Sequence, residues 1–187
     1  MANRNTQGFG LVPAGTLGST PATSGQGKYK IDAGSTTTLY HGGAVASASG
    51  YIVDGQTTDA PILGVLNGIF YNDATTLKPT FANFYKQPIT PANSEDIDAF
   101  VFDNPQQQYV VATDDSVAQS GFLETYDMNT SSGSDTTGKS NATLDIGDTS
   151  ADAASFRLLR SAEDPENDEN AAFRSVVVVP NLIELQS

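Results

Sequence analysis

The sequence predicts an all-β fold: a single β-barrel or β-sandwich domain that carries an extended N-terminal arm. Gly, Ser, Thr, Asn and Asp are abundant, whereas charged residues make up only 17% of the chain. Short apolar runs rich in Val, Ile, Thr, Tyr and Phe recur along the chain, and several alternate with period two. Turn clusters such as "DNPQQ" and "EDPENDEN" separate these runs. Short strands joined by such turns are typical of sandwiches and barrels.

The first 27 residues are rich in glycine and hydroxyl side chains, and their one apolar group is Phe9, Leu11 and Val12. Such a segment cannot bury enough apolar surface to fold alone. We therefore expect an N-terminal arm over residues 1–27 and a β domain over residues 28–187. Two interpretations of the arm stay open. It is either a floppy terminus or a segment that orders when Phe9 to Val12 dock on a partner.

Within residues 28–187, the strands are expected at the apolar runs 29–31, 38–40, 51–53, 62–71, 81–85, 97–102, 109–113, 122–126, 142–146, 156–160 and 173–185. Residues 114–122 are compatible with one helical turn, and 149–160 with a strand in spite of their alanines. Pro180 indicates that strand pairing is interrupted there or lies at an edge. No repeat of about 20–50 residues is visible, which argues against a propeller or solenoid.

The formal net charge of −13 is unevenly distributed. Residues 1–31 hold Arg4, Lys28 and Lys30 and no acid, whereas residues 32–187 hold 22 acids against six bases. An acidic body of this kind excludes nucleic acid and anionic membranes as expected partners. The chain has no cysteine, which excludes disulfides, thiolate metal sites and cysteine nucleophiles. Because no apolar run resembles a signal peptide or a membrane span, we expect a soluble protein made in a cytoplasm.

Residues 133–140, "GSDTTGKS", satisfy the pattern of the phosphate-binding loop of nucleotide hydrolases. That loop works between a buried apolar strand and a long helix. Here "LETYDMNTS" precedes the loop and "NATLDIGDTS" follows it, and neither flank is of the required type. We therefore interpret the motif as an exposed polar loop. Whether it faces solvent or a neighbouring subunit stays open.

No catalytic, cofactor-binding or metal-binding residue is expected. His41 is the only histidine, and the pair Asp114 and Asp115 lies in a turn sequence without the apolar pocket that paired carboxylates need for glycoside hydrolysis. Acid-rich segments at 163–170 and 144–152 are interpreted as solvated loops. Calcium binding by these loops stays open, since neither segment has the spacing of an EF-hand.

Several segments together resemble the head-decoration, or capsid cement, proteins of tailed bacteriophages. They are, in order, "GFGLVPAG", "GKYKI", "LYHGGAVAS", "APILGVLNGIFY", "DAFVFDNPQQQYVVATDD", "TTGKSNATLDI" and "FRLLRSAEDPENDENAAFRSVVVVPNL". These segments cover nearly the whole chain. The sequence departs from the family at "LYHGG", where relatives tend to have a glycine-acid-proline-valine turn, and in the length of its acidic loop.

The resemblance implies a non-enzymatic virion protein on the outer surface of the icosahedral head. Such a protein binds the major capsid protein, often as a homotrimer, and stabilises the coat lattice against internal DNA pressure. We expect the residues that contact the coat to be Arg4, Phe9, Leu11, Val12, Lys28, Tyr29 and Lys30. The alternative is a receptor- or carbohydrate-binding β module of a phage tail or surface appendage, which would need an exposed aromatic platform.

Overall fold

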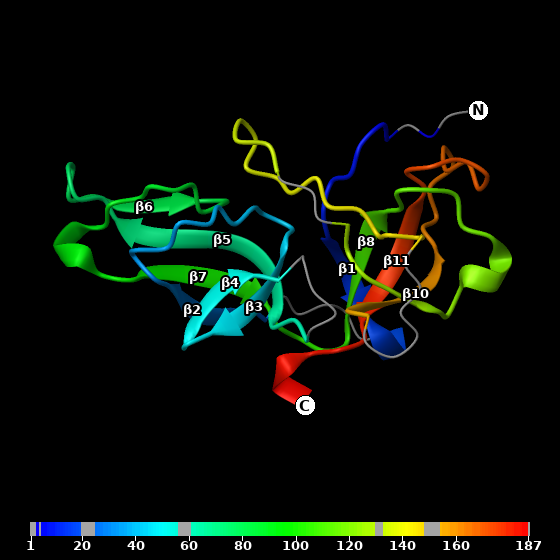
Figure 1. Cartoon of the computed structure of the whole chain (residues 1–187), viewed down its shortest axis with the longest axis horizontal. Coiled ribbons are helices and arrows are strands. Elements are labelled where there is room, and N and C mark those ends of the chain that lie inside the picture. Colours follow the sequence, from blue (N-terminus) through cyan, green and yellow to red (C-terminus); the bar gives the residue numbers. More distant parts are fainter. Residues whose placement is uncertain are drawn as a thin grey trace.

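The computed structural model describes residues 3, 5–19, 25–55, 61–129, 133–147 and 154–186. It confirms the all-β prediction, because the regular structure consists of two antiparallel sheets and four single 3₁₀ turns. The two sheets lie in two adjoining parts of the molecule (Figure 1). We call these parts the five-stranded lobe and the six-stranded lobe. No helix of the described chain is long and apolar enough to cross a membrane.

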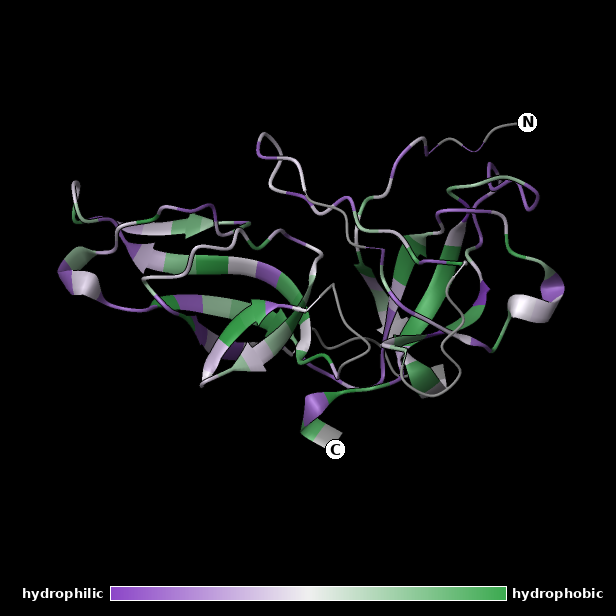
Figure 2. Cartoon of the chain, in the orientation of Figure 1, coloured by the Kyte–Doolittle hydropathy of each residue, from purple (hydrophilic) through white to green (hydrophobic). Residues whose placement is uncertain are grey.

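The five-stranded lobe has the strand order β1-β8-β11-β10-β9. Its strands are β1 (Val12–Thr16), β8 (Gln107–Ala112), β9 (Thr125–Tyr126), β10 (Phe156–Ser161) and β11 (Ser175–Pro180). The central strand β11 contains the apolar run Val176–Val179 (Figure 2) and is buried from Ser175 to Val179. The predicted strand at 173–185 is therefore a core strand that ends at Pro180, which cannot donate a further backbone hydrogen bond.

The six-stranded lobe has the strand order β2-β7-β5-β3-β4, and β6 pairs with the second half of β5. Its strands are β2 (Gly27–Ile31), β3 (Ala44–Ala48), β4 (Tyr51–Asp54), β5 (Gly64–Asn72), β6 (Pro79–Ala82) and β7 (Ile97–Phe102). The sheet curls until its first and last strands, β2 and β4, lie close together. No backbone pairing between these two strands closes the described part of the sheet into a barrel.

The 3₁₀ turns connect these strands. They are η1 (Leu17–Ser19), η2 (Ala92–Ser94), η3 (Gln119–Gly121) and η4 (Glu184–Gln186). The third is the helical turn expected within residues 114–122. The predicted runs 38–40 and 142–146 form only isolated bridges, through Leu39 and Leu144.

The N-terminal segment differs from our expectation of an arm outside the domain. Strand β1 pairs with β8 along its length, from Val12 opposite Val110 to Thr16 opposite Gln107. Leu11, directly before this strand, is only 1% exposed. Strand β1 is thus part of the five-stranded lobe, because a segment that is too polar to fold alone obtains its partner from β8. Since β2 to β7 follow β1 and precede β8, the six-stranded lobe is an insertion in the five-stranded lobe.

Two apolar clusters form the core. One lies in the six-stranded lobe and includes Ile69, Ile97 and Val101. The other lies in the five-stranded lobe around Tyr109 and Phe156, and it also contains residues of the other lobe, namely Ala44, Ile62 and Val65. Apolar packing is therefore continuous across the junction of the lobes.

The loop 133–140 strengthens this junction by packing against the six-stranded lobe of its own chain. The Tyr40 hydroxyl donates a hydrogen bond to Asp135 Oδ1 at 2.7 Å, and the Asn83 amide donates one to the Thr137 carbonyl at 2.8 Å. The Lys86 ammonium lies 3.1 Å from Asp135 Oδ2. The loop thus straps one lobe to the other (Figure 1).

Candidate functional site

Three charged side chains meet on the outer face of the six-stranded sheet. On β2, residues 28 and 30 point to solvent, and on β7 residue 98 points to the same face because it pairs directly with residue 30. Both lysine ammonium groups, of Lys28 and Lys30, lie 2.6 Å from the Asp98 carboxylate. This Lys28–Asp98–Lys30 cluster keeps one net positive charge on the surface of a strongly acidic protein.

The pKa values of this cluster follow from its geometry. Burial alone would raise the pKa of Asp98, but the hydrogen bonds from Lys28 and Lys30 hold it below its ordinary value. The hydrogen bond to Asp98 in turn raises the pKa of Lys30. The ionised forms of Asp98 and Lys30 are therefore their stable forms at neutral pH.

Three phenylalanines lie beside this cluster on the same face. Phe70 of β5 pairs with Asp98 on one neighbouring strand and with Phe81 of β6 on the other. Phe100 of β7 pairs with Lys28. The rings of Phe70 and Phe81 are 4.8 Å apart between centroids, and those of Phe81 and Phe100 are 6.1 Å apart. Phe81 is 73% exposed. We call these three rings the aromatic stripe.

The aromatic stripe and the charged cluster form one surface because the strand register aligns them. A glycine, Gly68, stands opposite Phe100 on β5, and a β-carbon there would come within 3.0 Å of the Ala82 carbonyl oxygen. The chain at Ala82 therefore leaves little room for a side chain at Gly68. The result is an exposed apolar strip with two lysines at its edge, a combination that is typical of a surface that binds another molecule.

The expected contact residues do not form one surface. Lys28 and Lys30 belong to the face just described, but Tyr29 points inward and donates a hydrogen bond to Asp103 Oδ2 at 2.7 Å. Burial, followed by this hydrogen bond, raises the pKa of Tyr29 to about 12. Tyr29 is thus partly buried and its hydroxyl has an internal partner, so it supports the fold.

The other expected contact residues lie in the five-stranded lobe or outside the described chain. Leu11 is part of the core, so in this structure its side chain is not on the surface. Phe9 is half-buried, and Val12 is 48% exposed at the start of an edge strand. Arg4 lies outside the described residues.

The residues of the nucleotide-binding pattern have structural contacts. Gly138 adopts a φ of 71°, and a β-carbon there would overlap Phe84 and Asn83. Ser140 is buried, and its backbone N–H donates to the His41 carbonyl at 2.9 Å. His41 Nδ1 lies 2.8 Å from the Asn67 carbonyl oxygen. The loop therefore contacts its own chain through these residues, whereas residues 135–137 and 139 stay exposed.

The carboxylates of the acidic turn at 114–115 bind backbone groups of the same chain. Asp114 Oδ1 accepts a hydrogen bond from the Ile146 backbone N–H at 2.9 Å, and Asp115 Oδ1 accepts one from the Ser116 N–H at 2.6 Å. Asp114 thus joins its turn to the segment around Ile146, whereas Asp115 stabilises only its own turn. They do not face one another across an apolar pocket.

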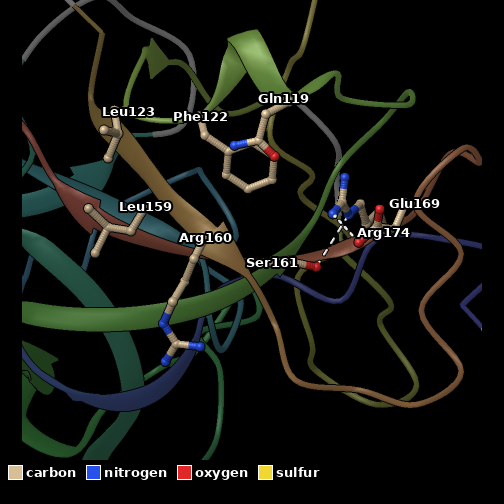
Figure 3. A pocket seen from close by; sticks show the side chains of 8 residues that line it. All are labelled: Gln119, Phe122, Leu123, Leu159, Arg160, Ser161, Glu169 and Arg174. Carbon is tan, nitrogen blue, oxygen red and sulfur yellow. Dashed lines mark hydrogen bonds and ion pairs between the residues drawn. The ribbon is translucent and has the colours of Figure 1, made fainter.

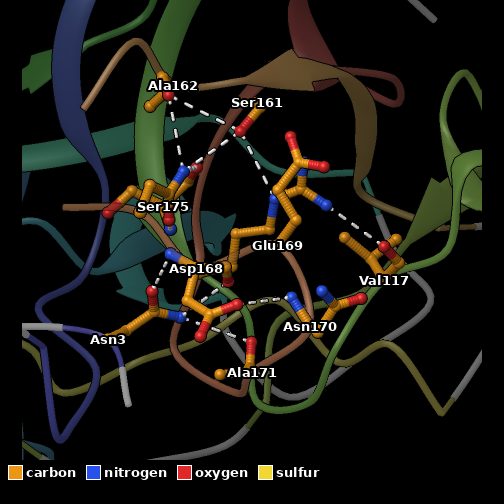
Figure 4. A network of polar contacts seen from close by, with 11 residues as sticks. Asn3, Val117, Ser161, Ala162, Asp168, Glu169, Asn170, Ala171 and Ser175 are labelled. Atoms are coloured by element: carbon orange, nitrogen blue, oxygen red, sulfur yellow. Dashed lines mark hydrogen bonds and ion pairs between the residues drawn. The ribbon is translucent and has the colours of Figure 1, made fainter. Parts of the chain in front are cut away.

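The acidic loop between β10 and β11 is held mainly by amide side chains (Figure 4). Asn3 donates hydrogen bonds to the carbonyls of Ala171 and Ala172, and its own carbonyl accepts one from the Asp168 N–H. Asn167 similarly binds Ser175 through both its carbonyl and its amide. Within the described ranges, no three histidine, aspartate or glutamate side chains converge as metal ligands do.

Sequence reasoning missed the aromatic stripe. Phe70, Phe81 and Phe100 were assigned to strands, but each strand alone indicates only that alternate residues share a face. The missing information is register, because the three rings meet only when β7 pairs with β5 and β5 with β6. A weak signal was present in β7, "IDAFVF", where Phe100 alternates with the buried residues Ala99 and Val101 and falls on the side of Asp98.

The chain matches no protein family model, no curated protein and no solved structure.

Proposed function

We propose that the protein is a non-enzymatic capsid decoration protein, as in the bacteriophage head-decoration family that its sequence resembles. In this proposal it binds the outer surface of an icosahedral head, contacts the major capsid protein and stabilises the coat lattice. The observation that supports the proposal best is the aromatic stripe with its lysine edge. The stripe gives the contact a specific surface, which here replaces the N-terminal arm as the main docking element.

Two physical features favour a protein lattice as the partner. An exposed aromatic strip is the type of surface that becomes the apolar centre of a protein interface, where aromatic side chains are enriched. The net positive charge of the Lys28–Asp98–Lys30 cluster favours an acidic patch on the partner. Repetition of such contacts over a lattice, or in a trimer, would raise the effective affinity without any further contact.

The test is binding of the purified protein to expanded heads of the phage that encodes it, measured by co-sedimentation and by imaging of the decorated shells. We expect near-coat copy number for the wild-type protein. Phe81→Ser should abolish decoration, since interface aromatic residues commonly contribute about 2 kcal/mol or more to binding. The same variant should fold normally, because Phe81 is largely exposed.

Leu185→Ser provides the matched control. Leu185 is also a large exposed apolar residue, at 56%, but it lies in the C-terminal turn η4 and outside the aromatic stripe. Decoration that survives Phe81→Ser as well as Leu185→Ser would show that the stripe is not the docking surface. Presence of only a few copies per virion would contradict decoration itself.

The aromatic stripe also favours a second candidate, a carbohydrate-binding module of a phage tail or surface appendage. Sugar rings stack on exposed aromatic faces, and the Lys28–Asp98–Lys30 cluster lies beside the rings to bind hydroxyl groups. A glycan array separates the candidates. Specific glycan binding that Phe81→Ser removes would favour this second function over decoration.

A further inference from the structure

A cavity of about 310 Å³ opens on the five-stranded lobe (Figure 3), whereas the aromatic stripe belongs to the six-stranded lobe. Its volume lies at the lower end of the range of small-ligand pockets. The wall combines apolar side chains of the β8–β9 connection and β10 with polar groups from the start of β11 and the acidic loop. The lining of the cavity includes Phe122, Leu123, Leu159, Ser161, Glu169 and Arg174.

The guanidinium of Arg174 forms the polar end of this cavity. Its side chain is only 5% exposed, and its carbon atom Cζ lies 5.2 Å from the ring centroid of Phe122. Two of its nitrogens bind internal groups: Nη1 donates to the Val117 carbonyl at 3.2 Å and Nε to Ser161 Oγ at 3.3 Å. These contacts fix the orientation of the guanidinium plane. The third nitrogen, Nη2, is the one that meets a carboxylate.

That carboxylate belongs to Glu169, a residue that a ligand can readily displace. Its Oε1 lies 3.3 Å from Arg174 Nη2, but its side chain is 73% exposed. An exposed carboxylate stays hydrated when it leaves its partner, so only the buried Arg174 guanidinium needs a replacement anion. The backbone of the acidic loop is held separately, through Asn3 and Asn167 (Figure 4), so the Glu169 side chain can swing out while the loop stays in place.

The apolar side of the cavity contains an unusual residue. Leu123 is 62% exposed, and its φ of 70° lies in the left-handed region that leucine rarely adopts. Its backbone is held on both sides, because its N–H donates to the Leu158 carbonyl at 2.8 Å and its carbonyl accepts from Arg157 Nη1 at 2.7 Å. An exposed apolar side chain in an enforced, strained conformation is a mark of a functional site.

We propose that this cavity binds a carboxylate carried on a small apolar body. The ligand carboxylate replaces that of Glu169 on Arg174, and the apolar body packs against Leu123, Leu159 and the ring of Phe122. Ser161 supplies a second donor: its oxygen accepts hydrogen bonds from Asn167 and Arg174, but its own proton has only a long contact, with the Ala162 carbonyl at 3.5 Å. Such a carboxylate comes either from a small metabolite or from the free C-terminus of a protein chain. The proposal does not depend on the proposed function.

The test is a ¹H–¹⁵N NMR titration of the full chain with 3-phenylpropionate, in which the Arg174 Nε–H and the backbone amides of residues 159–161 are followed. We expect saturable shifts at these positions with a Kd of about 1 mM, as is usual for a ligand of this size. The neutral isostere 3-phenylpropionamide should bind at least about tenfold more weakly. A peptide that ends in leucine, with a free or an amidated C-terminus, distinguishes the two sources.

Two charge variants provide a matched pair. Glu169→Gln removes the competing carboxylate and should tighten binding of 3-phenylpropionate about fivefold. Glu163→Gln removes the same charge from the same loop, but Glu163 pairs with Arg160, at 3.7 Å, and not with Arg174. In Figure 3, Arg160 extends away from Arg174. Glu163→Gln should therefore leave the affinity nearly unchanged.

A third variant tests the apolar wall of the cavity and should still fold. Leu123→Asn should weaken binding about fivefold and should leave Tm unchanged or raise it, because asparagine tolerates a positive φ better than leucine. The proposal is overturned if the amide isostere binds as well as the acid, if Glu163→Gln tightens binding as much as Glu169→Gln, or if the shifts map to another surface.

Discussion

Asp98 holds in place the two lysines at the edge of the proposed docking face. Its carboxylate lies between two lysines that would otherwise repel each other across neighbouring positions of one strand. Their hydrogen bonds lower its pKa against the opposing effect of burial. A carboxyl group whose pKa is lower in the folded state stabilises the fold above its unfolded pKa, and this contribution is lost as the pH falls through the folded value.

The lowered pKa of Asp98 in the folded state predicts how the stability of Asp98→Asn depends on pH. The variant should have a free energy of unfolding about 1 kcal/mol below that of the wild type at pH 7, a modest value because both lysines are about half exposed. The difference should be constant between about pH 5 and 9 and should shrink as the pH falls below the ordinary aspartate pKa of 3.8. Urea unfolding at several pH values measures it. A difference that grows on acidification would contradict the assignment.

At the scale of elements, β1 shows how a segment of unpromising composition becomes part of a sheet. Its sequence, "VPAGT", contains only one strongly apolar residue, and register shifts between Pro13 and Gly15. It is an edge strand whose proline has no N–H to donate, which is where sheets tolerate proline. The residue that holds it in place is Leu11, whose N–H also donates to the Gly42 carbonyl of the other lobe at 2.8 Å.

The neighbours Leu11 and Val12 should therefore respond very differently to truncation. Leu11→Ala removes a buried side chain from the core and should cost about 3 kcal/mol of unfolding free energy. Val12→Ala, at a half-exposed position, should change it by about 0.5 kcal/mol or less. Chemical denaturation of both variants measures the contrast. Equal, small effects would restore the interpretation of residues 1–27 as an arm outside the domain.

The loop 133–140 is the second element whose role differs from its sequence pattern. In a nucleotide-binding loop the lysine is the essential residue, whereas here the glycine is. Gly138 has a positive φ and leaves no room for a β-carbon against Phe84, while Lys139 is exposed.

Gly138→Ala should therefore destabilise the protein by about 2 kcal/mol. In a chain of this size that corresponds to a decrease in Tm of roughly 4–8 °C. Lys139→Ala should leave Tm nearly unchanged, because its side chain lies in solvent. Thermal unfolding followed by circular dichroism compares the two. The reverse order of effects would argue for the nucleotide-binding pattern.

At the scale of the whole molecule, the two lobes share their interior. The apolar cluster of the five-stranded lobe includes Ala44, Ile62 and Val65 of the inserted lobe. Backbone hydrogen bonds also cross the junction, because the Ile62 N–H donates to the Leu182 carbonyl at 3.2 Å and the Glu184 N–H donates to the Ile62 carbonyl at 2.9 Å. Neither lobe buries its apolar surface fully without the other.

We therefore expect the protein to unfold in one cooperative transition in spite of its two sheets. Differential scanning calorimetry should give one peak whose calorimetric and van't Hoff enthalpies agree. Two separated transitions would show that the lobes are independent units.

Much of the fold was predictable because strand composition is a local property. The run "SVVVV" of β11 and the alternation in β7 identified buried strands correctly, whereas β3, "AVASA", lacks aromatic residues and was missed. The partner of each strand is not a local property. For that reason the insertion of one lobe into the other, the burial of Leu11 and the meeting of Phe70, Phe81 and Phe100 could not be predicted from single strands.

The contacts of loop 133–140 with the six-stranded lobe have a consequence for how the gene evolves. Asp135 of this loop binds Tyr40 and Lys86 of the other lobe. Tyr40 and Asp135 are 95 positions apart, and Lys86 lies between them in the chain. A genetic exchange that replaced the inserted lobe alone would separate this carboxylate from both of its partners. We therefore expect the three residues to be inherited together and to change together among descendants of this gene.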